Sequence, residues 1–310
     1  MKVLVTGSGG FIGGALVGRL RESGIEQIYG VSRKPGLDVP GVEHWSIDLA
    51  DERCVPALCN FVEKVDPDWI IHLAGSRGPK AASLWGANVS AAAHLLEAVR
   101  KCQSGARVAI SGSAAEYGAG AESGEAIGEA NACRPSNEYG ISKYCQTLYA
   151  LDFGRRHGIS VNVLRLFNVV GKGMPDTLFC GAVLKRAVRS LRDGSKIIEV
   201  GNLHSKRDYV TVTDVAEAFV GVCRSHCEGE IFNICSGVPV ASDTLLQTML
   251  SMFPETIRFH VNAGLATRPE VSSIHGSWTK ASDMFGFRPC TLLSDALHDA
   301  YLEAMAEETV

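Results

Sequence analysis

The sequence contains no apolar stretch long enough to cross a bilayer, no run of basic residues, and no repeated or low-complexity segment. With a net charge of −4 and no basic run, the chain has no electrostatic footprint for nucleic acid. We therefore expect neither a membrane nor a nucleic-acid partner. The partners predicted for such a chain are small molecules or other copies of itself.

Paired metal-ligand motifs are also missing. The ten cysteines form no CxxC pair and the nine histidines form no HExxH motif, so the sequence predicts no metal site. Several cysteines lie in apolar runs, where reduced thiols pack as small hydrophobes. The first residues form a strand-like run without a signal-peptide pattern, and on this basis we expect a cytoplasmic protein.

What the sequence does contain is an alternation of strand-like and helical segments. With 310 residues, 46% of them hydrophobic, the chain can bury a large core. Apolar runs that alternate with helical patterns predict a parallel sheet with crossover helices. The expected strands cover residues 3–5, 27–31, 42–47, 69–73, 107–110 and 160–166. The predicted fold class is α/β, a Rossmann-like doubly wound parallel sheet with a smaller mixed α/β domain.

Two domains are expected, because the alternation gives way to a Gly-rich loop and shorter mixed elements after the first half of the chain. Residues 1–167 form the first domain in this prediction, and residues 168–310 form the smaller second domain over the edge of the sheet. A helical run followed by strand-like residues at 231–234 indicates that 207–235 returns to the first domain. The second domain is then discontinuous.

A glycine-rich loop at residues 6–13 directly follows the first strand and leads into a helix. Gly7, Gly10 and Gly13 allow a tight turn, close approach of the backbone to a pyrophosphate, and close packing of helix on strand. Phe11 and Ile12 open the helix, whose N-terminus attracts an anion. In this context the loop predicts a dinucleotide site in residues 1–167.

The end of the second strand indicates which dinucleotide is bound. It carries Ser32 and Arg33 instead of the acidic residue that holds the ribose 2′-hydroxyl of NAD. A hydroxyl and a forked guanidinium suit a 2′-phosphate, so NADP(H) is favoured and NAD(H) is the alternative. The alternative is that these residues form a solvent-exposed basic turn that binds no phosphate. Further cofactor contacts are expected at Asp48, Leu49, Leu73, Ala74, Gly75 and Asn88.

Tyr139 and Lys143 are spaced i, i+4 at the start of a helix-like run, so their side chains lie on one face. A phenol is a poor acid or base at neutral pH unless a nearby positive charge lowers its pKa, and Lys143 can supply that charge. Ser113, near a strand end, can hold the reacting oxygen while Tyr139 gives or takes its proton. The spacing alone is also compatible with an ordinary helix surface, so its context decides.

With the glycine loop, the run at 110–118 and the Tyr139 to Lys143 segment in order, the chain resembles an extended short-chain dehydrogenase/reductase over nearly its whole length. Later segments at 165–169, 207–210 and 286–289 are similar to the nucleotide-sugar branch of that family. In many relatives the helices near Val89 and Tyr139 pair across a two-fold axis, so the resemblance also implies a homodimer.

The resemblance implies specific roles for residues of this chain. Ser113, Tyr139 and Lys143 are the implied catalytic residues, and Tyr139 and Lys143 also contact the cofactor. The implied partner is a nucleotide-diphosphate sugar. Its implied contacts are Ser113, Asn168, Arg207 and Arg268, and the two arginines suit the diphosphate.

Within this branch, 4,6-dehydratases place carboxylates directly after the catalytic Ser or Thr to eliminate water across C5 and C6. This chain has Ala114 and Ala115 at those positions. Glu116 follows one position later, and it points away from the site if the strand end is extended there. The resemblance therefore favours a 4-ketosugar reductase or a 4-epimerase over a 4,6-dehydratase.

Segments at 200–208, 233–237 and 268–270 are most similar to GDP-4-keto-6-deoxy-D-mannose reductases, whereas 169–173 replaces the His-containing Gly-Pro-Gly loop of that subgroup. NADP suits a reductase, which consumes reduced cofactor. We therefore expect NADPH-dependent reduction of the C4 ketone of a nucleotide-linked 4-keto-6-deoxyhexose. The alternatives are a 4-epimerase with tightly bound NAD and an idle NADP-sensing scaffold, and a complete Ser, Tyr and Lys set argues against the scaffold.

Overall fold

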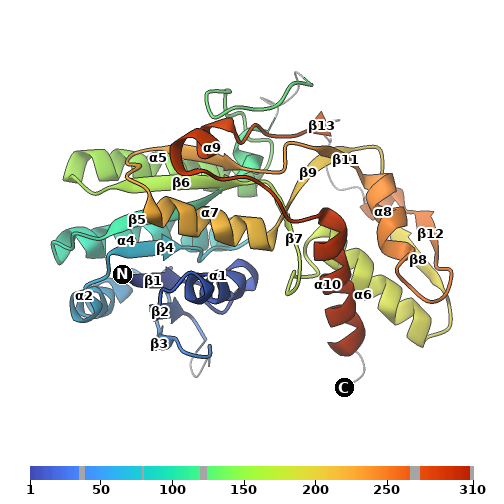
Figure 1. Ribbon diagram of the computed structural model, residues 1–310, viewed down its shortest axis with the longest axis horizontal. Helices are drawn as coiled ribbons and strands as arrows, with labels where there is room; N and C mark the ends of the chain where they lie inside the picture. Colours follow the sequence, from blue (N-terminus) through green and yellow to red (C-terminus); the bar gives the residue numbers. More distant parts are fainter. Residues whose placement is uncertain (35–38, 79, 119–123, 266–272, 308–310) are drawn as a thin grey trace.

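A seven-stranded parallel sheet forms the larger part of the molecule (Figure 1). The computed structural model describes residues 1–34, 39–78, 80–118, 124–265 and 273–307. The strand order is β10-β6-β5-β4-β1-β2-β3, which confirms the predicted doubly wound fold. The strands are β1 (Lys2–Thr6), β2 (Gln27–Ser32), β3 (Glu43–Ser46), β4 (Trp69–His72), β5 (Arg107–Ser113), β6 (Val161–Leu166) and β10 (Ile231–Ile234).

Helices cover both faces of this sheet. On one face α1 (Phe11–Glu22) packs against α7 (Val212–Arg224). On the other face α4 (Ala91–Lys101) packs between α2 (Cys54–Val65) and α5 (Glu138–His157). The short elements α3 (Ala81–Leu84), η1 (Trp85–Ser90), η2 (Ala114–Glu116) and α9 (Thr279–Phe285) complete this part.

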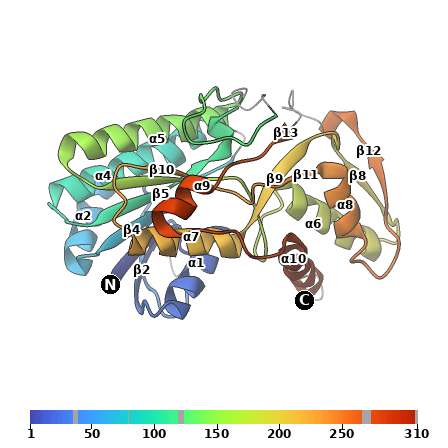
Figure 2. The same cartoon turned by 45° about the horizontal axis from the view of Figure 1, so that its top comes forward.

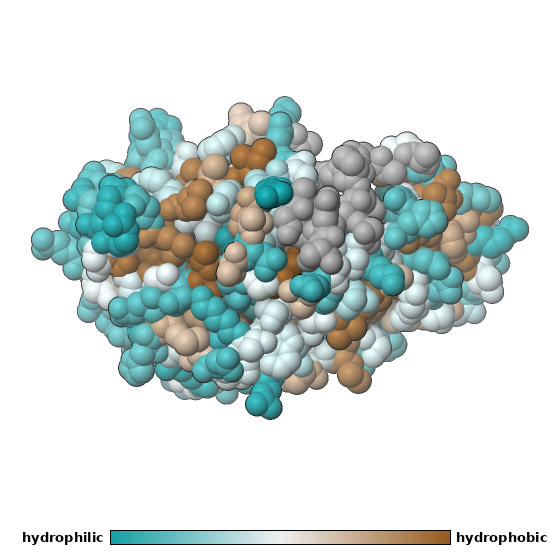
Figure 3. Space-filling model, turned by 90° about the horizontal axis from the view of Figure 1, so that it is seen from above, coloured by the Kyte–Doolittle hydropathy of each residue, from teal (hydrophilic) through white to brown (hydrophobic). Residues whose placement is uncertain are grey.

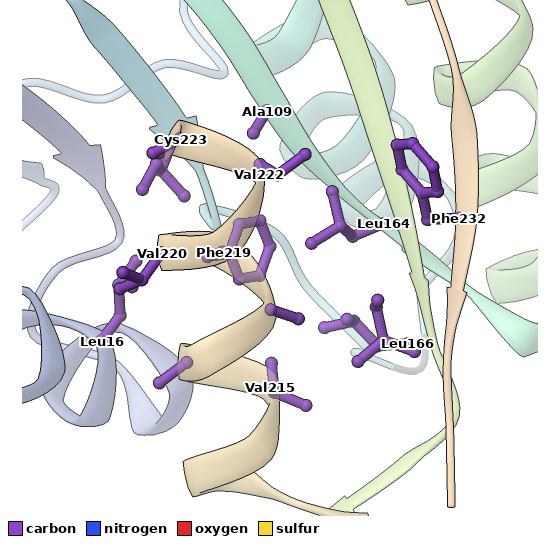
Figure 4. Close-up of a cluster of buried hydrophobic side chains, with 14 of the residues drawn as sticks. Leu16, Ala109, Leu164, Leu166, Val215, Phe219, Val220, Val222, Cys223 and Phe232 are labelled. Carbon is purple, nitrogen blue, oxygen red and sulfur yellow. The ribbon is translucent and has the colours of Figure 1, made fainter. Parts of the chain in front are cut away.

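The two faces hold separate apolar clusters, because side chains alternate between the faces along each strand. In β1, for example, Val3 belongs to the cluster under α1 and α7, and Leu4 belongs to the cluster under α2, α4 and α5. Figure 4 shows the first cluster, in which Phe219 of α7 points toward Leu164 and Leu166 of β6. Each face of the sheet is therefore buried under its own layer of helices.

The smaller part lies beside the larger one (Figure 2). Its main sheet is centred on β9 (Lys206–Thr211), which pairs with β7 (Asn168–Val170), β11 (Pro239–Ala241) and β13 (Ser273–Ile274). A second pair joins β8 (Ile197–Val200) to β12 (Arg258–Val261). Helices α6 (Phe179–Arg192), α8 (Ser242–Leu250) and α10 (Leu293–Glu307), with η4 (Ala263–Leu265), complete this part, whose core is a third apolar cluster.

The two parts are joined by a buried carboxylate. Asp208 of β9 accepts hydrogen bonds from the N–H groups of Ser236 (2.8 Å) and Gly237 (2.9 Å), which follow β10, and of Gly276 (3.1 Å), which precedes α9. β10 pairs with β6 and α7 packs on α1, while β9 belongs to the smaller sheet. The division of the chain into two domains stays a prediction.

No helix in the described ranges is long and apolar enough to span a membrane. The face seen from above in Figure 3 carries apolar patches over the half of the molecule that holds the larger sheet, interspersed with hydrophilic side chains.

Candidate active site

Two adjoining cavities, each of about 320 Å³, lie beside the glycine loop, and both are lined by Gly7, Gly10, Leu73 and Gly75. The strand order reverses between β1 and β4 at this point, and ligands of doubly wound sheets bind at such a reversal. The first cavity is also lined by Phe11, Ile12, Gly13, Asn88, Ser113, Tyr139 and Lys143. The second cavity is also lined by Ser32, Arg33, Asp48, Leu49 and Ala74. Every cofactor contact expected from the sequence therefore lines one of the two cavities.

The glycine loop is pressed against the end of β4. Gly7 has φ +73°, and a Cβ on it would lie 3.0 Å from the backbone nitrogen of Ala74. A Cβ on Gly13 would lie 2.1 Å from the Gly7 carbonyl oxygen, so helix α1 can approach the loop only without a side chain there. The N-cap Gly10 makes no side-chain cap, and the first turn of α1 has no acidic residue. The positive end of this helix dipole is therefore open to an anion.

The second cavity contains hydrogen-bond donors that suit the adenosine end of a dinucleotide. The Ser32 hydroxyl oxygen is buried and has no hydrogen-bond partner in the described part of the chain. A buried unpaired hydroxyl is costly unless a ligand or water satisfies it. Arg33 lies next to it with an exposed side chain. These residues fit an adenosine ribose, with Arg33 suited to a phosphate on it, so the donor set matches an NAD(P) cofactor.

Strand β5 ends at Ser113, and the chain then turns into η2. The N–H of Ser113 donates to Oε1 of Glu116 (2.8 Å), and its hydroxyl accepts from the N–H of Ala115 (3.2 Å), which is a capping box. The chain is therefore not extended after Ser113, because this reciprocal cap closes a turn. Ala114 and Ala115 do not line the first cavity.

Glu116 is fully buried behind the cavity. Its Oε2 accepts from Nε of Arg165 on β6 (2.8 Å), and Nη1 of Arg165 also donates to the hydroxyl of Tyr117 (3.1 Å). Burial raises the pKa of the Glu116 carboxyl, and the positive charge of Arg165 opposes that rise. None of the described residues that line the first cavity is an aspartate or a glutamate.

Lys143 lies in the first turns of α5 with its side chain almost fully buried, and its Nζ donates to the Ser111 carbonyl oxygen (2.5 Å). Burial lowers the pKa of Lys143 to about 8, Glu116 opposes this shift, and the positive charge of Arg77 adds to it. Lys143 is therefore mostly in its ammonium form at neutral pH, and its pKa lies only slightly above that pH.

Tyr139 is half-buried in the first turn of α5. The side chain of Asn137 caps this helix by accepting from the N–H of Gly140 (2.9 Å). Ser142 donates its hydroxyl to the Tyr139 carbonyl oxygen (2.8 Å) and accepts from Nδ2 of Asn88 (2.9 Å). The start of α5 is thus fixed from two sides, which orients Tyr139 and Lys143 toward the cavity that Ser113 also lines.

The other expected substrate contacts do not meet there. Nδ2 of Asn168 donates to the Asp208 carbonyl oxygen (2.9 Å), and Nη1 of Arg207 donates to the Lys206 carbonyl oxygen (2.8 Å). Neither residue lines either cavity. Arg268 lies outside the described residues. The roles of these three residues stay predictions.

Several residues of the first cavity were not anticipated from the sequence. They are Ser76, Arg77, Ser111, Gly112, Leu166, Phe167, Val169, Pro175, Thr177 and Leu178. Ser76 and Arg77 follow the expected Leu73 to Gly75 segment directly, so their position at a strand end could have indicated them. No local sequence pattern indicates residues 175–178 as cavity residues, because they reach the cavity only through the tertiary fold.

The described part of the chain contains no group of three or more His, Cys, Asp or Glu side chains that could hold a metal ion. All ten cysteines carry free thiols. Burial raises the pKa of Cys54 to about 11 and of Cys180 to about 12. Such thiols are poor nucleophiles at neutral pH.

The fold and the cavity residues define an NAD(P)-dependent enzyme of the extended short-chain dehydrogenase/reductase type. Residues 3–235 match the model of the NAD dependent epimerase/dehydratase family, and the chain belongs to that family.

Three relatives illustrate the range of that family. The chain is 29% identical over 309 residues to dTDP-6-deoxy-L-talose 4-dehydrogenase (NAD(P)(+)) of Kitasatospora kifunensis, which covers 97% of this chain and 94% of the relative. It is 28% identical over 239 residues to GDP-6-deoxy-D-mannose reductase of Pseudomonas aeruginosa, covering 74% and 78%. The solved structure of MoeE5 with UDP-glucuronic acid and NAD is similar with a TM-score of 0.84 and 25% identity, covering 100% of both chains.

Proposed function

We propose that the protein reduces the C4 ketone of a nucleotide-linked 4-keto-6-deoxyhexose, such as GDP-4-keto-6-deoxymannose, with NADPH as the reductant. The observation that carries this proposal is the first cavity, where Ser113, Tyr139 and Lys143 meet beside the glycine loop without a lining carboxylate among the described residues. Elimination across C5 and C6 needs such carboxylates. Reduction of a ketone does not, because Tyr, Ser and Lys supply all the proton chemistry.

Each of the three side chains has a defined task in this proposal. A bound reduced nicotinamide supplies the hydride to C4. Tyr139 donates its proton to the C4 oxygen, which becomes the hydroxyl of the product, and Ser113 holds the same oxygen by a hydrogen bond. Lys143, protonated below about pH 8, keeps a positive charge beside the phenol and binds the nicotinamide ribose. Replacement of Tyr139 by Phe should lower turnover at least ~100-fold and leave NADPH binding largely intact.

NADPH is proposed over NADH because of the second cavity. The unpaired Ser32 hydroxyl and the Arg33 guanidinium both suit a 2′-phosphate. One relative is named for both NAD and NADP, and the MoeE5 structure holds NAD. The choice is tested by comparing Kd values for NADPH and NADH by fluorescence titration of the wild type.

The reaction is tested by following NADPH and NADH absorbance with GDP-, dTDP-, UDP- and CDP-linked 4-keto-6-deoxy sugars, beside the corresponding intact sugar nucleotides. Oxidation of the cofactor with ketosugars alone is expected. Tightly retained NAD in the purified protein, together with interconversion of intact sugar nucleotides and no net cofactor consumption, would instead identify a 4-epimerase. Tight NADPH binding without turnover of any of these sugars would leave only a sensing role.

We also propose a homodimer that uses α5. Ile141 and Leu148 lie seven residues apart, on one face of this helix, and their side chains are 41% and 53% exposed. A second copy that presents the same face would cover both residues across a two-fold axis. Analytical ultracentrifugation is expected to give twice the chain mass for the wild type and the monomer mass for Leu148→Glu; a monomeric wild type contradicts the proposal.

A further inference from the structure

Arg77 lies in the loop after β4 and lines the first cavity with Ser113, Tyr139 and Lys143. Its guanidinium carbon is 4.8 Å from the centroid of the Tyr139 ring. This distance is within the range of a cation–π contact, in which a guanidinium is attracted to the face of an aromatic ring. The contact restricts the ring that carries the proposed proton donor.

The Arg77 side chain is exposed, and it has neither an ion-pair partner nor a hydrogen-bond partner within the described ranges. Other arginines of the chain, such as Arg19, Arg100 and Arg155, pair with nearby carboxylates. The charge of Arg77 is therefore not neutralised by a neighbouring acid, and its nearest aromatic contact is the Tyr139 ring.

The backbone around Arg77 is fixed to the same helix that carries Tyr139. Ser76 donates its N–H to Oδ1 of Asn88 (2.8 Å) and accepts from Nδ2 of Asn88 at its carbonyl (3.1 Å). Asn88 in turn donates to Ser142, which donates to the Tyr139 carbonyl. The loop and the start of α5 are thus joined once through the side chains of Asn88 and Ser142 and once through the Arg77 guanidinium on the Tyr139 ring.

Several titratable groups surround Lys143. Glu116 faces it from η2, Arg77 from the loop after β4, His72 from β4, and Tyr139 from the same helix. Burial keeps His72 neutral, since it lowers the pKa of this histidine to about 3. Glu116 raises the pKa of Lys143 and Arg77 lowers it, so two opposite charges bear on the same ammonium.

Building on the proposed function, we propose that Arg77 is a positioning residue of the reaction: its guanidinium holds the Tyr139 ring in place and adds a positive charge beside Lys143. The two effects are separable by substitution. Arg77→Lys keeps the charge but loses the planar stacking group. Arg77→Gln loses both, and Arg155→Gln, at the far end of α5, is the matched control for an exposed arginine.

Steady-state kinetics test the positioning effect. For Arg77→Gln we expect kcat to fall by roughly tenfold, since even a displacement of ~1 Å near a reacting group costs up to ~100-fold. The KM for the sugar nucleotide and the Kd for NADPH should stay within about twofold. For Arg77→Lys we expect a smaller fall in kcat than for Arg77→Gln, and Arg155→Gln should have the kcat of the wild type. An unchanged kcat in Arg77→Gln, or a loss confined to NADPH affinity, would overturn the proposal.

The charge effect is tested without turnover. Competitive acetylation of Lys143 between pH 6 and 10, measured by peptide mass spectrometry, gives the titration of its amine. Its midpoint should move to higher pH in Arg77→Gln and stay in place in Arg77→Lys and Arg155→Gln; a midpoint that does not move in Arg77→Gln overturns this effect. The labelling needs no substrate, so it tests the charge effect independently of the proposed function. If the wild type reduces no ketosugar but the Lys143 midpoint still moves in Arg77→Gln, the proposed function is refuted and the charge effect of Arg77 on Lys143 stands.

Discussion

Removal of the Glu116 carboxylate should destabilise the protein far more than removal of an exposed carboxylate. In Glu116→Ala the Arg165 guanidinium, whose side chain is 3% exposed, loses the partner on its Nε. The N–H of Ser113 loses its acceptor as well. Neither group can reach bulk water, so both are left with an uncompensated desolvation cost.

The magnitude follows from the burial. Removing one partner of a buried ion pair costs about 3–5 kcal/mol, because the remaining charge is unpaired. An unfolding entropy of about 2 cal/mol/K per residue converts ~4 kcal/mol into a fall in Tm of about 6 °C for a chain of this length. The variant Glu116→Leu/Arg165→Leu removes both charges and should lose clearly less stability than Glu116→Ala, since no charge stays buried alone.

Urea unfolding at pH 7 and scanning calorimetry measure both variants. Asp152→Ala is the matched control: it breaks the ion pairs of an exposed carboxylate on α5 and should leave the unfolding midpoint in place. A loss of less than ~1 kcal/mol in Glu116→Ala, or a double variant as unstable as the single one, would refute the reasoning that Glu116 neutralises a buried cation.

Three further predictions concern titration and cofactor choice. Because burial lowers the pKa of His72 to about 3, the unfolded chain takes up a proton below pH ~6.5 that the native state does not. Stability should therefore fall by about 1.4 kcal/mol per pH unit from 6.5 toward 3 on account of His72, and urea unfolding of His72→Asn between pH 5 and 7 should show a smaller slope; an equal slope contradicts this. Burial lowers the pKa of Lys143 to about 8, so turnover should decline above that pH, and Lys143→Arg should be slower but lack this alkaline decline. Arg33→Ala should weaken NADPH binding about tenfold and NADH binding little, as measured by fluorescence titration; equal losses would exclude a 2′-phosphate contact.

The alternation of buried strands and helices was predictable because each element has a strong local period. Val3, Leu4 and Val5 alternate between two cores, and the residues of β4 are all buried, so the sequence there has few other solutions. The glycine loop was predictable for a similar reason, since its geometry depends on residues that are adjacent in the chain.

Features that depend on distant contacts were not predictable. The pairing of Glu116 with Arg165 on the neighbouring strand is one such feature. The turn after Ser113 is different, because Ser113 and Glu116 have the spacing of a capping box and could have indicated it. The contact of Arg77 with the Tyr139 ring was not predictable either, because Tyr139 is distant in sequence, although the position of Arg77 after β4 could have indicated it as a cavity residue. The cavity residues at 175–178 arrive from the smaller part of the molecule.

Asp208 has a consequence for engineering. Its one carboxylate, with no exposed surface, holds the segments at 236–237 and 276 to β9. A chimera that takes its sugar-side sheet from a relative must therefore inherit Asp208 and both receiving segments from the same parent. A crossover placed between them would join a carboxylate to amides whose positions evolved around another partner, and the recombined protein would lose the connection between its halves before any sugar contact was tested.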